Sequence, residues 1–142
     1  VEFRVSAHPG QPSGPMSKVA SGGELSRIGL AIQVIASASG NVPTLVFDEV
    51  DVGIGGGVAE IVGRLLKQLG GDRQVLCVTH LPQVAAQADR QWTVSKEGAD
   101  NGVVSRVIPL DREGRIEEIA RMLGGLQITP TTRKHAAEML GY

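Results

Sequence analysis

The stretch from Val19 to Arg27 constrains this chain most, because it places two glycines between a serine and a glutamate at the start of an apolar run. Ser21 and Glu24 have the Ser-x-x-Glu spacing of a capping box, which predicts that a helix begins here. The first turn of a helix attracts anions through its unpaired amides and its dipole, and Gly22 and Gly23 let a phosphate approach the backbone. An ordinary capped helix explains the same residues, so the stretch alone leaves both interpretations open.

Composition narrows the class of protein. The 142 residues suffice for one globular unit, and 42% hydrophobic with 20% charged residues are ordinary values for such a unit. A net charge of -1 gives no general attraction to nucleic acid or anionic lipid. No apolar stretch approaches the roughly 20 residues of a membrane span, so we expect a cytoplasmic protein with no membrane partner. Cys77 is the only cysteine, and its apolar neighbours predict a buried strand thiol rather than a nucleophile.

The hydrophobic pattern predicts an α/β fold with a mainly parallel sheet flanked by helices. Thr44–Phe47 is a continuous apolar run, which is typical of a parallel strand covered on both faces, and residues 74–79 form a second such run. Helices are predicted around them at 24–38, where apolar residues cover more than one face, at 58–69 and at 82–88.

The two ends of the chain have a different character. Residues 91–96 and 103–110 predict a C-terminal hairpin, followed by two helices over 113–123 and from Thr129 to Met139. At the other end, Glu2–Val5 predicts a short strand, and the glycines and prolines of 8–15 predict a loop.

Three side chains that could bind a ligand or act in catalysis follow the two predicted parallel strands. Asp48 and Glu49 end the first strand and His80 ends the second, where open α/β sheets bind ligands. Asp48 could hold Mg²⁺, Glu49 could orient or deprotonate a water that attacks a phosphoryl group, and His80 could bond the same phosphate. Each has a structural alternative, either a solvated strand end or a packed histidine. Their joint order favours phosphate chemistry.

These segments together resemble the C-terminal lobe of ABC-type ATPase heads, which have the P-loop NTPase fold. Within that superfamily they are similar to the bacterial RecN family of SMC-like DNA repair proteins. Val50 stands where transporter heads usually have proline, and Glu24 stands where they have glutamine. The resemblance rests on the signature motif at 19–27, the Walker B strand at 44–49, the D-loop at 50–54 and the switch-histidine segment at 78–85.

The resemblance implies a role for each candidate residue. The signature residues would bind the γ-phosphate of ATP held by a second head, so that ATP joins two heads and hydrolysis separates them; these residues are Ser21, Gly22, Gly23 and Glu24. Asp48 would hold Mg²⁺ and Glu49 would be the catalytic base of ATP hydrolysis. Asp51 would bridge the dimer interface, and His80 would sense the γ-phosphate.

One expected motif is missing from the sequence. No Gly-Lys-Ser or Gly-Lys-Thr occurs, so these residues include no P-loop to cradle phosphates. The resemblance implies that the P-loop lies in an N-terminal lobe and that residues 1–142 are the C-terminal lobe. It also implies that the full-length protein is nucleoid-associated and binds DNA. The alternatives are a lobe of an ABC transporter ATPase, an SMC-type chromosome-organising head, or a dimerisation module without turnover.

Overall fold

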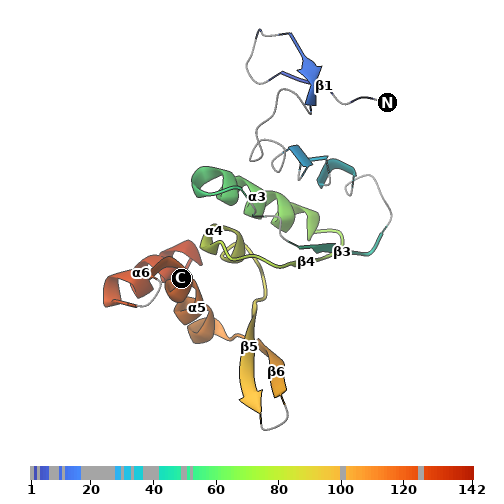
Figure 1. Ribbon diagram of the computed structural model, residues 1–142. Helices are drawn as coiled ribbons and strands as arrows, with labels where there is room; N and C mark the ends of the chain where they lie inside the picture. The colour runs from blue at the N-terminus through green and yellow to red at the C-terminus, as the bar shows by residue number, and fades with distance from the viewer. Residues whose placement is uncertain are drawn as a thin grey trace.

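The computed structural model describes residues 2, 4–6, 10, 12–16, 28–29, 31–32, 34–36, 42–48, 51, 53–99, 102–124 and 127–142. Within them the chain is α/β, as predicted, with one parallel and two antiparallel strand pairs. Figure 1 shows α3 lying along the parallel pair β3–β4, while the hairpin β5–β6 extends away from the helices. None of the helices in the described part of the chain is long and apolar enough to span a bilayer.

The parallel pair confirms the two strands predicted from continuous hydrophobicity. β3 spans Thr44–Phe47 and β4 spans Gln74–Cys77, with Thr44 opposite Gln74 and Phe47 opposite Cys77. The predicted second strand ran to residue 79, whereas the observed ladder ends at Cys77. The Val78 amide still donates to the Phe47 carbonyl at 2.9 Å. The segments that follow both strands therefore begin side by side at one end of the pair.

Helix α3, Gly56–Leu69, joins β3 to β4 and begins two residues before the predicted start. It packs on the sheet through a core that also includes a residue of α4, Pro82–Ala85. This α4 is shorter than the predicted helix over 82–88. The buried side chains of this core are Val34, Phe47, Ala59, Val62, Leu66 and Val84.

A second core lies between α4 and the two C-terminal helices, both of which were predicted. α5 spans Arg112–Gly124 and α6 spans Pro130–Met139, and Thr129 caps α6 by accepting from the Thr132 amide at 3.1 Å. Their buried side chains pack with the end of α4 in a cluster of Ala85, Ala86, Ile119, Ala120 and Ala136. Arg115 fixes this packing because its guanidinium donates to the Ala88 carbonyl at 2.6 Å.

The two antiparallel pairs lie before β3 and between α4 and α5 in the chain. β5, Trp92–Ala99, and β6, Gly102–Pro109, form the predicted hairpin. β1, Arg4–Val5, was predicted as a short strand, and it pairs with β2, Gly14–Pro15. The predicted loop over 8–15 is therefore wrong for residues 14 and 15, which form β2. Proline is compatible with this pairing because a two-stranded sheet consists only of edges.

Several apolar side chains are more exposed than the sequence predicted. The strands were expected to be covered on both faces, yet Val46 is 63% exposed and Val78 is 61% exposed. Of the predicted helix at 24–38, residues 28–29, 31–32 and 34–36 are described and helical, but only Val34 among them is buried. Within the described residues, α3 covers one face of the strand pair and the other face is open.

The contact between α3 and α4 predicts the effect of one methyl group. A Cβ at Gly63 would lie 3.0 Å from the Gln83 carbonyl oxygen and 3.2 Å from Val84 Cα, both backbone atoms. We expect Gly63→Ala to lower the free energy of unfolding by about 1–3 kcal/mol, because α4 must shift to admit it. Gly57→Ala, on the same helix with nothing within 4 Å of its added Cβ, is the control. Urea unfolding should show Gly57→Ala as neutral or stabilising, and equal losses in both variants would contradict this packing.

Candidate functional site

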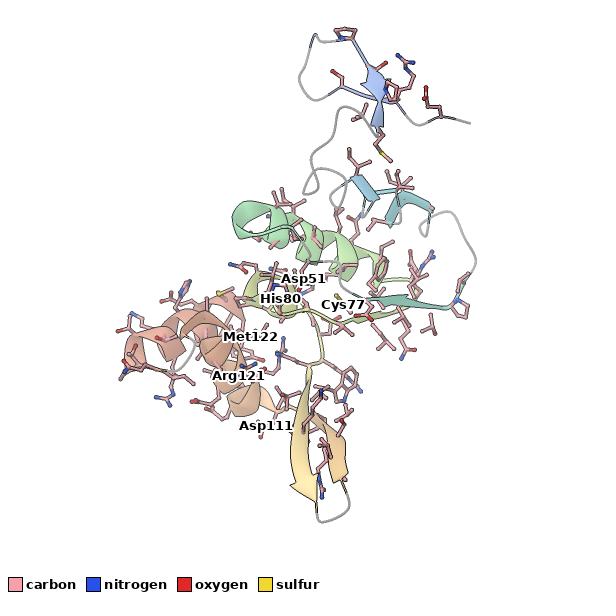
Figure 2. All side chains as sticks on the ribbon, in the orientation of Figure 1. Asp51, Cys77, His80, Asp111, Arg121 and Met122 are labelled. Atoms are coloured by element: carbon pink, nitrogen blue, oxygen red, sulfur yellow. The ribbon has the colours of Figure 1, made fainter. Side chains whose placement is uncertain are left out.

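The residues after β3 and β4 are joined by one buried carboxylate. Asp51 Oδ2 accepts from the Thr79 hydroxyl at 2.6 Å and from the His80 backbone amide at 2.6 Å, and it lies 2.9 Å from His80 Nδ1 in an electrostatic contact. Figure 2 shows Asp51 and His80 close together beneath α3, near the end of β4. The Thr79 hydroxyl also accepts from the Leu81 amide at 3.0 Å, so the network reaches the first residue before α4.

Asp51 remains charged in this buried position because of its donors. The residue is only 3% exposed, and burial alone would raise the pKa of its carboxyl. The hydrogen bonds from Thr79 and from the His80 amide, with a smaller attraction from the imidazole, outweigh that effect, and the pKa is lowered. The carboxylate is therefore an ionised anchor at neutral pH.

The His80 side chain is exposed to solvent although one of its ring nitrogens contacts Asp51. Its side chain is 70% exposed although Nδ1 contacts the buried carboxylate. A carboxylate can only accept, so Nδ1 carries the proton in this contact. Nε2 is consequently the ring nitrogen that is left for a partner outside the network.

Asp48 follows β3 and is exposed, in contrast to Asp51. A free carboxylate at a strand end fits Mg²⁺, which prefers oxygen ligands and keeps several of its waters. No group of three or more His, Cys, Asp or Glu side chains placed to hold a metal occurs within the described ranges. The role of Asp48 as an Mg²⁺ ligand stays a prediction, with which its exposure is compatible.

Cys77 lies at the end of β4 as a half-buried thiol, consistent with the predicted structural role. Burial, with smaller contributions from the charges of Asp51 and Asp48, raises its pKa to about 11. The thiol is protonated at neutral pH, and a protonated thiol is a poor nucleophile.

The structure brings together only part of the predicted site. Asp51 and His80 are in direct contact, and Asp48 lies on the same side of the sheet end, after β3. The predictions for Ser21, Gly22, Gly23, Glu24 and Glu49 lie outside the described residues. The bridging role implied for Asp51 concerns a second head and stays a prediction; within this chain its carboxylate is turned inward.

Thr79 is the member of the network that the sequence argument missed. Its hydroxyl orients the Asp51 carboxylate and also receives the Leu81 amide. The sequence does contain a signal for this contact: Thr79 directly precedes His80, and Asp51 follows the neighbouring parallel strand.

Sequence comparison relates the chain to proteins of one kind. It is 54% identical over 140 residues to the DNA repair protein RecN of Vibrio cholerae, 49% to that of Streptomyces coelicolor and 45% to that of Bacillus subtilis. Each alignment covers 99% of this chain. The chain spans about a quarter of the length of these curated relatives, 24–25%. No family model matches the chain.

Comparison with solved structures finds SMC ATPase heads among the proteins with a similar fold. A structure described as concerning ATP-driven dimerization and DNA stimulated activation of SMC ATPases superposes with a TM-score of 0.67 at 23% identity, over 83% of this chain and 70% of that one. The SMC head domain of Thermotoga maritima gives 0.56 at 31% identity, over 72% and 37%. The Pyrococcus yayanosii Smc head with a coiled coil gives 0.63 at 26% identity, over 78% and 20%.

The lowered pKa of Asp51 predicts a pH-dependent stability. The unfolded carboxyl has a pKa of about 3.9, and the folded pKa is lower. Ionised Asp51 therefore stabilises the fold fully above about pH 4, and this contribution is lost as the pH falls through the folded pKa. Asp51→Asn should cost about 1–3 kcal/mol of unfolding free energy at pH 7, with the difference from wild type shrinking below pH 4.

Urea unfolding between pH 7 and pH 3 measures this difference. Thr79→Val, which removes one of the two hydrogen-bond donors but keeps the charge, should give a smaller loss. A loss for Asp51→Asn that is constant across this pH range would contradict the charged anchor.

Proposed function

We propose that this chain is the C-terminal lobe of an ATP-hydrolysing head in an SMC-like protein of double-strand break repair and recombination. The premise is that the chain is a homologue of the RecN family of DNA repair proteins over 99% of its length, with the fold of an SMC ATPase head. Its identity to RecN proteins, 44–54%, exceeds its identity to the SMC heads, 23–31%, which favours repair over the SMC-type alternative. The single observation that carries the proposal is the 44–54% identity to RecN proteins over 99% of this chain, and the contact between Asp51 and His80 at the end of the parallel pair supports the site within it.

That contact supports a phosphate-facing role for His80. The parallel register puts the ends of β3 and β4 side by side, so Asp48 and His80 follow neighbouring strand ends, and Glu49 is the next residue after Asp48 in the sequence. The exposed imidazole can contact the γ-phosphate of ATP without a rearrangement of the backbone, since its amide and ring are already held. The loop ends of parallel strands are where α/β folds bind such ligands.

The acids after β3 divide the remaining work. Asp48 would hold Mg²⁺, which neutralises charge on the phosphates when it is bound. Glu49, the next residue, would orient the attacking water and take its proton. Glu49, the base that would take the proton, is therefore next in sequence to Asp48, the residue that would hold the metal.

The signature residues would act on ATP bound by another head. If the predicted helix begins at Ser21, the Ser21 hydroxyl and the amides of Gly22 and Gly23 would bind the γ-phosphate, and Glu24 would complete the cap. ATP placed between two heads would join them, and its hydrolysis would release them. ATP-driven dimerization is described for SMC ATPases that share this fold.

Exposed apolar surface supports a second partner, an N-terminal lobe that carries the P-loop. Valines of the open face of β3–β4 and of the hairpin are among the exposed residues, namely Val46, Val78, Val94, Val103 and Val107. Parallel strands normally occur in sheets covered on both faces, so this surface needs covering. The same lobe would supply the Gly-Lys-Ser or Gly-Lys-Thr that this sequence lacks.

DNA would be engaged by the full-length protein, as the name of the RecN relatives indicates for them. The place of action would then be the bacterial cytoplasm, at the nucleoid.

Glu49 gives the first test of this function. In the full-length protein, Glu49→Gln removes the base but keeps the shape of the side chain. Steady-state ATP turnover should fall by about 100-fold or more, and ATP-bound head dimers should accumulate because release requires hydrolysis. Phosphate release and size-exclusion chromatography with ATP measure the two effects.

Glu60→Gln is the matched control, since Glu60 is an exposed glutamate of α3 that pairs with Arg64 on the same helix. It should keep wild-type turnover. Unchanged turnover in Glu49→Gln would remove Glu49 from the mechanism.

The missing P-loop gives a second test. The purified 142-residue chain should bind ATP weakly and hydrolyse none, because no segment of it can cradle the β- and γ-phosphates. Titration calorimetry and phosphate release measure this. Appreciable turnover by this chain alone would contradict the division of the site between two lobes.

A further inference from the structure

The Asp51 carboxylate contacts residues of its own chain, and the identity of those residues suggests its role. Two of the three groups that contact Oδ2 belong to His80, namely its backbone amide and its ring Nδ1. We propose that Asp51 is a positioning residue that holds His80 in the orientation that meets the γ-phosphate, acting through His80 rather than on ATP. This inference rests on the proposed function and assigns within it a role that differs from the dimer bridge.

The two contacts fix different features of His80. The hydrogen bond from the amide fixes the backbone after β4, and the 2.9 Å contact with Nδ1 restrains the ring torsion and favours a proton on Nδ1. A histidine that is 70% exposed would otherwise sample several rotamers in solvent. Anchoring Nδ1 leaves Nε2 as the outward nitrogen, so the ring is ordered before a ligand arrives.

Asp51 is itself held firmly enough to act as an anchor. The residue is 3% exposed, and the Thr79 hydroxyl bonds the same oxygen at 2.6 Å. The Ile54 amide donates to the Asp51 carbonyl at 3.3 Å, which ties the backbone to the turn before α3. The anchor thus belongs to the segment after β3, while the histidine belongs to the segment after β4, so the network couples the two strand ends.

Two other roles compete with this one. A purely structural carboxylate would stabilise the fold without affecting how His80 serves catalysis. A bridge between heads would require the carboxylate to face a second protein, but Oδ2 faces three polar groups of its own chain. Burial and partner identity favour positioning over both.

A double-mutant cycle in the full-length protein separates positioning from the structural role. The variants are Asp51→Ala, Asp51→Asn, His80→Ala and the Asp51→Ala/His80→Ala pair, with single-turnover and steady-state ATP hydrolysis as readouts. Asp51→Ala should lower kcat by roughly 10- to 100-fold, the range seen when a supporting partner is lost behind a functional histidine, with little change in KM. Asp51→Asn should lose less, because its amide oxygen can still accept.

The decisive result is the coupling between the two positions. If Asp51 acts through His80, adding Asp51→Ala to His80→Ala should change the rate by less than about twofold. Losses that multiply would overturn the positioning role while leaving the proposed function intact. Wild-type turnover in His80→Ala would reject the phosphate-sensing role itself, and this proposal with it.

Ile119→Val controls for stability, because Ile119 is fully buried in the C-terminal core away from this network. It should lower the thermal midpoint and keep kcat. If Asp51→Ala and Ile119→Val, compared at equal fractions folded, lose the same turnover, the loss reflects stability and positioning is rejected.

Discussion

The described half of the site depends on one carboxylate oxygen that is removed from water. A buried charge is tolerated only when donors replace its hydration, and Asp51 Oδ2 accepts two hydrogen bonds and contacts His80 Nδ1. All three groups belong to Thr79 and His80, which follow β4, whereas Asp51 follows β3. Parallel pairing makes this possible because it brings both strand ends to the same edge. The sheet sets the meeting place, and the charge locks the two segments together there.

The exposed valines favour the proposal that a further lobe stabilises this chain. α3 buries Phe47 and its neighbours on one face of β3–β4, while Val46 and Val78 remain open among the described residues. Two parallel strands with one covered face bury little apolar surface, and the hydrophobic effect scales with that surface. A further lobe that covers the open face would add this stabilisation and would also bring the P-loop, so folding and completion of the nucleotide site would depend on the same contact.

The sequence predicted the strands, α3, the hairpin and the C-terminal helices well, because their patterns are local. The Thr129 cap of α6 was predicted from a few adjacent residues and is present. Continuous hydrophobicity in Thr44–Phe47 correctly predicted a parallel strand, yet predicted burial on both faces that the described residues do not provide. Sequence patterns record burial in the complete protein. The contact between Asp51 and Thr79 spans 28 positions, and no local pattern reports which acid meets which donor.

Burial therefore distinguishes acids that the sequence alone presents as equals. Asp48 and Asp51 are three residues apart after the same strand, but one is exposed and the other is 3% exposed. An exposed carboxylate can exchange water for a metal ion at little cost. A buried one such as Asp51, which accepts hydrogen bonds from the Thr79 hydroxyl and the His80 amide, would have to break them first, and each bond to a charged group is worth about 1.5–3 kcal/mol. Under the proposed function, ligand chemistry would thus fall to Asp48 and to the outward face of His80, and Asp51 would hold that histidine.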